Sequence, residues 1–170
     1  MPIIEGGSEY EVAGAPVAGT SEVQTLTIGG TPTGGTFKLA FDGYTTAAIT
    51  WSATNNTLRD NVDAALEALP NIGTGGVTTA VGTMTAGVGT LTITFAGNLA
   101  KMVVPLITVA DNSMTGTAPT AAVAETTPGV DVTARGAKIG ATLKDTTNGI
   151  LYINTGTAIS PTWTKVGTQT

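Results

Sequence analysis

The sequence predicts a β-rich α+β fold: an antiparallel sheet or sandwich with one helix packed on it, a small C-terminal β-hairpin module and an extended N-terminal arm. Three observations predict it. Short runs of alternating apolar and polar residues recur along the chain, as expected for strands with one buried face. Glycine is abundant, with 23 residues in 170, and supplies candidate turns between these runs. Only one segment shows the apolar period of a helix.

Residues 1–20 are expected to form the extended N-terminal arm. They contain Pro2, Pro16 and several glycines, and no regular apolar period runs through them. The arm nevertheless carries more apolar side chains than a solvated tail needs, which favours docking on a surface. These side chains include Ile3, Ile4, Tyr10 and Val12.

The β-rich body is expected over residues 21–128. Strands are predicted at 22–28 and 36–41, separated by a glycine-rich turn at 29–35. Asp42-Gly43 is a strong hairpin signal, after which the chain is expected to return as a strand. The remaining strands are predicted at 45–51, 77–81, 90–95, 103–109 and 121–126, with Pro105 marking an edge or a break.

One helix is predicted over residues 57–69. Thr57 is a good N-cap residue, and Asp60 follows three positions later, as in a capping box. Apolar residues then recur along one stripe of the helix, and a proline and a glycine follow its end. We interpret the opposite face, with Arg59, Asp63 and Glu67, as solvated.

Residues 129–138 are expected to be a linker, and residues 139–170 a C-terminal β-hairpin module. Asn148-Gly149 indicates a type I′ turn between two short strands, and Trp163 lies on a third. About 35 residues cannot bury enough apolar area to fold alone without a metal or a disulfide. The module is therefore expected to pack on the body, on a neighbouring copy or on a host surface.

The composition argues against an enzyme. The chain has no histidine and no cysteine, the residues that supply most acid–base chemistry near neutral pH and most transition-metal ligands. No glycine-rich stretch has the ending of a phosphate loop. The nearest approach to a calcium loop is Asp111-Asn112-Ser113, which lacks the required spacing of oxygens. We therefore expect no catalytic residue, no cofactor and no metal site.

The low charge indicates which partners to expect. Only 11% of the residues are charged and the net charge is −5, so neither nucleic acid nor an anionic membrane is an expected partner. No apolar run approaches the roughly 20 residues of a membrane span. Charge-poor strands with open edges are tolerated best where a partner covers them, which favours a protein that works in an assembly.

Two parts of the chain resemble known phage proteins. Residues 22–28 and 34–43, followed by Ala64-Ala65-Leu66-Glu67-Ala68-Leu69 and Asn71-Ile72-Gly73, resemble a module of virion proteins from phages that infect actinobacteria. Residues 145–156 and 163–167 resemble the hairpin found at the ends of phage head-decoration and fibre proteins. One copy of the first module with a short end module suits a capsid decoration protein better than a long fibre.

The resemblance implies a decoration protein on the outer surface of the capsid, expected as a homotrimer bound to the major capsid protein. Its interface is expected to include Ile3, Ile4, Tyr10 and Val12 of the arm, with Tyr152 and Trp163 of the hairpin module. Two alternatives stay open. One is an adhesive domain of a head or tail fibre that binds host-surface glycans through an exposed aromatic residue. The other is a tail structural protein.

Overall fold

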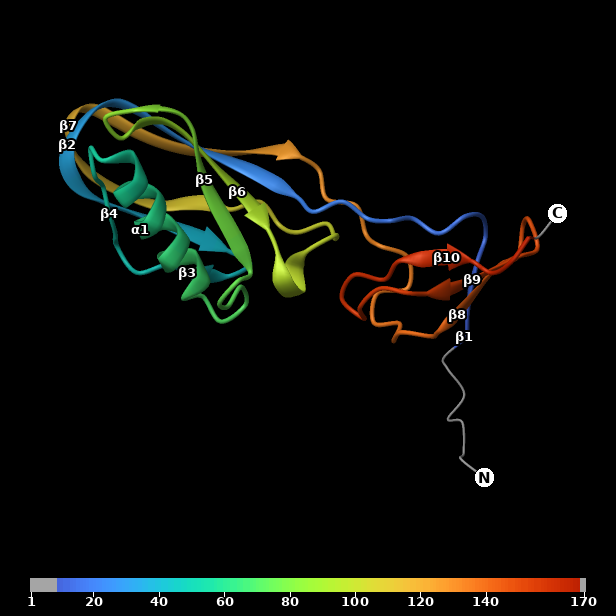
Figure 1. Cartoon of the computed structure of the whole chain (residues 1–170). Helices are drawn as coiled ribbons and strands as arrows, with labels where there is room; N and C mark the ends of the chain where they lie inside the picture. The colour runs from blue at the N-terminus through green and yellow to red at the C-terminus, as the bar shows by residue number, and fades with distance from the viewer. Residues whose placement is uncertain (1–8, 169–170) are drawn as a thin grey trace. The chain divides into compact units, whose positions relative to one another are not determined.

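The computed structural model describes residues 9–168, which form ten strands, one α-helix and one short 3-10 helix (Figure 1). The expected β-rich α+β fold is confirmed. The chain divides into two compact units: the body, Ser21–Gly129, and a small unit that combines the residues up to Thr20 with those from Val130 onward. In chain order the elements are β1 (Glu9–Val12), β2 (Val23–Phe41), β3 (Tyr44–Thr45), β4 (Ile49–Thr50), α1 (Asn55–Glu67), β5 (Val77–Thr85), β6 (Val88–Phe95), η1 (Gly97–Leu99), β7 (Thr108–Thr127), β8 (Thr142–Asp145), β9 (Ile150–Asn154) and β10 (Trp163–Lys165).

The body is an antiparallel sheet centred on β2, which is 19 residues long. β6 pairs with the first half of β2 and β5 pairs with β6, whereas β3 and β4 pair with the second half. β7 follows β2 along both halves, on the side opposite these strands. β2 and β7 therefore form one long ribbon, which curves around at the end of the body (Figure 1).

This ribbon replaces the turn that the sequence predicts at residues 29–35. No hairpin forms there, because both halves of β2 pair with β7 rather than with each other. Gly30 and Gly35 take φ angles of 74° and 85°, and the pairing register shifts between them, so the ribbon bends without being interrupted. The prediction of a turn between two strands is wrong, although both predicted segments lie in β2.

The strand predicted at 103–109 is also largely wrong, because β7 begins only at Thr108. Two buried side chains of the body hold the preceding loop instead. The carboxylate of Glu22 accepts a hydrogen bond from the backbone N–H of Val104 at 3.0 Å. The amide of Gln24 donates to the carbonyl oxygen of Pro105 at 3.0 Å and accepts from the N–H of Ile107 at 2.8 Å. These bonds satisfy backbone groups that a strand would otherwise pair.

The hairpin predicted at Asp42-Gly43 joins β2 to β3. Phe41 and Tyr44 are paired across it, so the loop has two residues. Asp42 and Gly43 have φ angles of 45° and 83°, and two positive φ angles are the requirement of a type I′ turn.

Helix α1 begins and ends earlier than predicted. Its N-cap is Thr54, whose side chain makes no capping hydrogen bond, so the predicted capping box at Thr57 is wrong. The predicted apolar stripe is buried as expected, with Leu58, Val62 and Leu66 inside the core. At 13 residues α1 is too short to cross a membrane, and within residues 9–168 no other helix is long and apolar enough to do so.

The face of α1 that we interpreted as solvated makes contacts with the body. Asp63 accepts a hydrogen bond from the N–H of Thr79 at 2.8 Å, and Glu67 accepts one from the N–H of Gly75 at 2.7 Å. Both carboxylates are half-buried. These two hydrogen bonds attach α1 to the loop that follows it and to β5.

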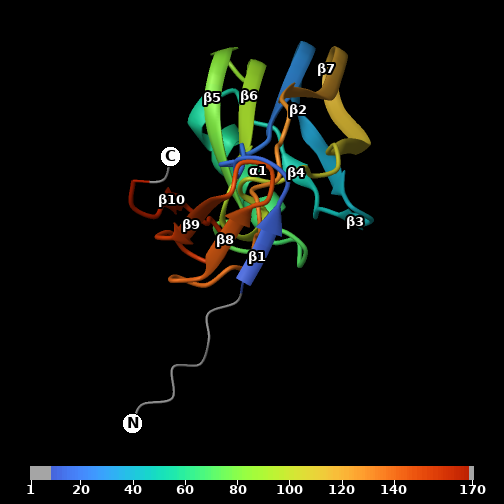
Figure 2. The same ribbon diagram turned by 90° about the vertical axis from the view of Figure 1, so that its right-hand side faces the viewer.

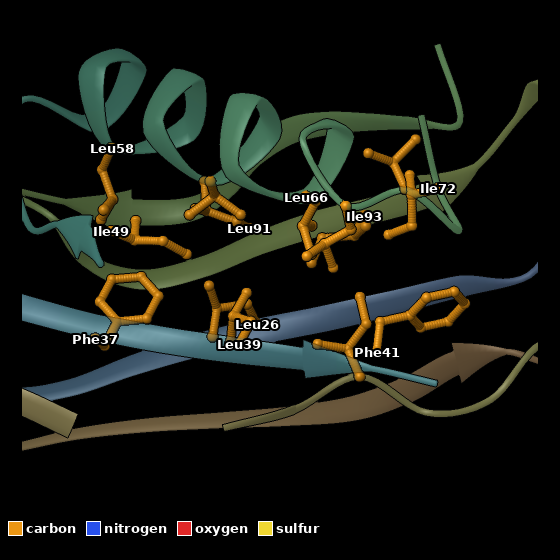
Figure 3. Packing of buried hydrophobic residues seen from close by; sticks show 14 of the residues in the cluster. Leu26, Phe37, Leu39, Phe41, Ile49, Leu58, Leu66, Ile72, Leu91 and Ile93 are labelled. Carbon is orange, nitrogen blue, oxygen red and sulfur yellow. The ribbon is translucent and has the colours of Figure 1, made fainter. Parts of the chain in front are cut away.

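The body has one hydrophobic core, to which α1, β2 and β6 contribute most of the side chains. Figure 3 shows the side chains of α1 meeting those of both halves of β2 and of β6. Both halves of β2 contribute because the bend of the ribbon turns them towards the same interior. The labelled residues are Leu26, Phe37, Leu39, Phe41, Ile49, Leu58, Leu66, Ile72, Leu91 and Ile93.

Replacing Asn55 with alanine should destabilise the body by about 1–3 kcal/mol. The Asn55 amide donates to the carbonyl oxygen of Met84 and accepts from the N–H of Gly87, both at 2.9 Å, and so ties the start of α1 to the β5–β6 hairpin. Urea unfolding followed by circular dichroism measures the change. Asn56→Ala is the matched control, because Asn56 is exposed at the next position of the helix. Equal losses in the two variants would contradict this role.

Candidate interaction surface of the small unit

The small unit is built on a four-stranded mixed sheet in the order β1-β8-β9-β10 (Figure 2). β8 and β9 form a hairpin, and β10 adds antiparallel to β9. β1 pairs in parallel with β8, with Tyr10 beside Leu143. Residues 9–12 therefore differ from the extended arm that the sequence predicts, since they are an edge strand of the C-terminal sheet. The reason is their alternation of two acidic and two apolar residues, which suits a strand.

The residues predicted as a linker are also part of this unit. Thr20 and Val130 exchange two backbone hydrogen bonds of 2.9 Å across an antiparallel bridge. The N–H of Thr133 donates to the carbonyl oxygen of Val17 at 3.0 Å, and the N–H of Val17 donates to the Thr133 hydroxyl at 2.8 Å. The segments before and after the body are thus joined to each other.

The pairing register places four of the predicted interface residues on one face of the sheet. The rings of Tyr10 and Trp163 meet edge to face, with their centroids 6.2 Å apart. The indole N–H of Trp163 donates to the carbonyl oxygen of Thr133 at 2.9 Å. All four residues, Tyr10, Val12, Tyr152 and Trp163, are half-buried, so this face packs within the small unit. Ile3 and Ile4 lie outside the described residues.

Asp145 connects β1 to the hairpin, a role that the sequence analysis missed. Its side chain is buried and accepts backbone hydrogen bonds from Gly14 at 3.0 Å, Thr147 at 2.9 Å and Asn148 at 3.0 Å. The amide of Asn148 donates to its second oxygen at 2.7 Å. The sequence did contain an indication of this role. Asp145 begins a loop of Thr, Asn and Gly residues, and an aspartate at that position often accepts hydrogen bonds from the backbone N–H groups that follow it.

These bonds also change the turn. The predicted type I′ turn requires positive φ at both Asn148 and Gly149, but of the two only Gly149 has it, at 70°. The hairpin loop instead has four residues and is closed by a 2.8 Å bond from the N–H of Gly149 to the carbonyl oxygen of Asp145. The predicted hairpin is present, and its predicted turn type is wrong.

Asn154 is a second buried polar residue that organises this unit. Its carbonyl oxygen accepts from the N–H groups of Gly156 and Thr162, both at 2.9 Å. Its amide donates to the carbonyl oxygens of Ala137 at 2.7 Å and Lys138 at 3.2 Å. The side chain uses all of its donors and acceptors and so holds two loops against the sheet.

Acid should loosen the small unit through Asp145. The side-chain hydrogen bond from Asn148 lowers the pKa of Asp145 below its ordinary value of 3.8, opposed in part by burial and assisted by the backbone donors. A lowered folded-state pKa means that the carboxylate stabilises the fold above the unfolded-state pKa, and that this contribution is lost as the pH falls through the folded-state value.

We therefore expect β1 to lose protection from amide hydrogen exchange below about pH 4, while the body strands keep theirs. Asp145→Asn is the control, since its side chain does not titrate in this range. Protection of β1 that stays constant to pH 2 in the wild-type chain would contradict the expectation.

The opposite face of the sheet is more exposed and mixed in charge. A depression of about 120 Å³ lies there, lined by Glu9, Glu11, Thr142, Lys144 and Leu151 of this face and by Tyr10, which lies between the two glutamates on β1. The small unit also exposes large apolar side chains, of which Ile139 is the most exposed at 72%. The others are Val17, Val130, Leu151, Ile159 and Val166.

No group of three or more acidic, histidine or cysteine residues within 9–168 is arranged to hold a metal ion. Asp111, which the sequence analysis singled out, lies in β7 and accepts a hydrogen bond from the Ser113 hydroxyl at 3.0 Å.

Comparison with known proteins gives a distant likeness among solved structures. No protein-family model and no curated protein matches the sequence. Among solved structures, a chain from Mycobacterium phage Patience is similar over 90% of this chain, with a TM-score of 0.43 and 19% sequence identity. This chain spans about half, 48%, of the length of that chain. A likeness this distant leaves the function to be argued from the residues themselves.

Proposed function

We propose that this chain is a bacteriophage decoration protein, which binds the outer surface of the assembled capsid as a homotrimer and stabilises it through several weak contacts with the major capsid protein. Residues 22–73 and 145–167 support the proposal, because they carry the resemblance to virion proteins. A trimer that contacts several capsid subunits at once binds far more tightly than one contact allows. Binding only the assembled capsid then stabilises it by mass action.

The observation that carries the proposal is the balance of apolar surface in the small unit. Its buried hydrophobic residues, among those described, are Val132, Ala137, Ala141 and Leu143, and two of these are alanines. Six large apolar side chains are exposed on the same unit. Apolar side chains exposed to water gain stability when a partner covers them. The small unit is therefore the part that we expect to meet the capsid.

The structure gives less support to the glycan-binding alternative. That alternative required an exposed aromatic side chain on the hairpin module, such as Trp163 or Tyr152. Trp163 is half-buried, its indole N–H is bonded to Thr133, and its ring packs against Tyr10. Tyr152 is also half-buried. Nothing observed in the structure favours the second alternative, a tail structural protein.

Co-sedimentation with capsids purified without this protein tests the proposal. We expect the wild-type chain to pellet with expanded capsids, and the double variant Ile139→Glu/Ile159→Glu to lose at least about tenfold in affinity, since each buried side chain contributes about 1.5–3 kcal/mol. Both positions are exposed, so the variant should stay folded.

Tyr44→Glu is the matched control, because Tyr44 is exposed to a similar extent on the body. Circular dichroism establishes that each variant is folded. Wild-type affinity in a folded Ile139→Glu/Ile159→Glu variant would remove the small unit from the interface. Failure of the wild-type chain to bind capsids at all would end the proposal.

A further inference from the structure

The outer edge of β7 is the longest unpaired strand edge of the body. β7 has 20 residues, most of them exposed, and among residues 9–168 only β2 pairs with it. It is the last strand of the row β5-β6-β2-β7, which Figure 2 shows side by side. An open edge of this length presents backbone donors and acceptors to any strand that approaches it.

The first half of this edge is protected by its own side chains. The amide of Asn112 donates to the carbonyl oxygen of Pro119 at 3.0 Å, and its oxygen accepts from the N–H of Met114 at 3.3 Å. Asp111 adds a charge, and Pro119 lacks a backbone donor. Charges, prolines and occupied backbone groups are the devices by which natural sheets prevent unwanted pairing.

Residues 120–124, which lie between Pro119 and Glu125, have none of these devices. These five residues are uncharged, and Ala122 and Ala124 are exposed. The direction of their backbone groups follows from the ladder on β2. The carbonyl oxygen of Glu22, the residue just before β2, accepts from the N–H of Phe95 on β6. Every second residue from Glu22 onward therefore bonds to β6, and the β2 residues between them bond to β7.

Thr27 and Thr25 are thus the β2 residues that bond to β7, opposite Ala122 and Ala124. The backbone groups of the intervening residues, Ala121 and Val123, consequently point away from the sheet. Side chains therefore protect the edge up to Pro119, whereas Ala121 and Val123 have backbone donors and acceptors that face outward.

We propose that residues 120–124 are a self-association site, at which a second copy of this chain adds its own residues 120–124 as an antiparallel strand about a two-fold axis at Ala122. In this register Ala121 of each copy faces Val123 of the other, and each such pair exchanges two backbone hydrogen bonds. The site goes beyond the proposed function, because it requires no capsid and its two-fold contact is separate from the three-fold contact of the proposed homotrimer.

Self-complementarity is what selects a second copy as the occupant. About Ala122, Thr120 faces Ala124 and Glu125 faces Pro119, so no two like charges meet. Pro119 cannot donate and its carbonyl oxygen is occupied by Asn112, which ends the pairing after these residues. An isologous two-fold contact also uses the same segment of both copies, so the pairing leaves neither segment open to a third copy.

Disulfide trapping tests the site, and the absence of native cysteine makes the result unambiguous. In the proposed register residue 122 faces itself across the axis in a non-hydrogen-bonded pair, where Cα atoms are about 4.5 Å apart, within the range of a disulfide. Under mild oxidation at high protein concentration, we expect Ala122→Cys to form covalent dimers about tenfold faster than Ala80→Cys, because pairing holds the two thiols together.

Ala80 is a matched control, being an exposed alanine of β5 in the same sheet. Ala124→Cys is a second control, because position 124 faces Thr120 of the other copy rather than itself. Equal rates for positions 122 and 80 would overturn the site, and equal rates for 122 and 124 would overturn the register.

Charge substitution provides an independent readout of the same contact. Ala122→Glu and Ala122→Lys should each shift the purified chain towards monomer in sedimentation equilibrium, because two like charges then face each other across the axis. An equimolar mixture of the two variants should restore the dimer. A wild-type degree of association in both single variants would overturn the proposal, whatever the outcome of capsid binding.

Discussion

Replacing Gly35 with valine is expected to destabilise the body by about 2–6 kcal/mol, a large fraction of the 5–15 kcal/mol that holds a typical domain folded. Gly35 has a φ angle of 85°, in the region where a β-branched residue is strained. A Cβ atom at this position would also overlap the carbonyl oxygen of Ser113 and the backbone of Met114 on β7. These are backbone atoms of the ribbon, so relieving the overlap requires β2 and β7 to separate.

The neighbouring residue supplies the control for this substitution. Gly34 has no positive φ angle, and a Cβ there would meet only the Thr115 hydroxyl at 3.3 Å. Gly34→Ala should therefore change the free energy of unfolding by far less than Gly35→Val. Urea unfolding followed by circular dichroism compares the two variants. A Gly35→Val chain as stable as the Gly34→Ala chain would show that the bend is not a fixed feature of the ribbon.

Replacing Asp145 with alanine should release β1 from the small unit. Four hydrogen bonds to one carboxylate would be lost, and three of their donors are backbone N–H groups. The N–H of Gly14 is among them, so the chain just after β1 would lose its attachment to the hairpin. Tyr10 would then lose its packing against Trp163.

Amide hydrogen exchange measures this release residue by residue. In Asp145→Ala we expect residues 10–14 to exchange as rapidly as an unfolded chain, with the protection of β2 and β6 unchanged. Lys144→Ala is the matched control, since Lys144 is the exposed neighbour of Asp145 on β8. Protection of residues 10–14 that survives in Asp145→Ala would show that strand pairing alone holds β1.

Local patterns in the sequence were enough to predict the elements whose pairing or packing partners lie nearby in the chain. The alternation around Phe37 and Leu39 predicts a strand with a buried face, and the Asp42-Gly43 turn follows directly from it. The stripe of Leu58, Val62 and Leu66 predicts the helix and its buried face. In these cases the period of the apolar residues and the identity of the turn residues contain the needed information.

The failures share a physical cause. A glycine-rich segment such as 29–35 permits both a hairpin and a bent strand, and only the distant β7 decides between them. β1 likewise pairs with a strand more than 130 residues away, and nothing in Glu9–Val12 identifies that partner. Nor does any local pattern show that the rings of Tyr10 and Trp163, which lie far apart in the sequence, meet edge to face.

The bridge between Thr20 and Val130 makes the body an insertion within the small unit, because the chain leaves for the body at one strand of the bridge and returns at the other. A pulling force applied to the segments before and after the body therefore acts first on the small unit. The body, Ser21–Gly129, carries no force until the bridge between Thr20 and Val130 breaks. In a stretching experiment the small unit should yield first, and the body should lengthen as a separate, later event.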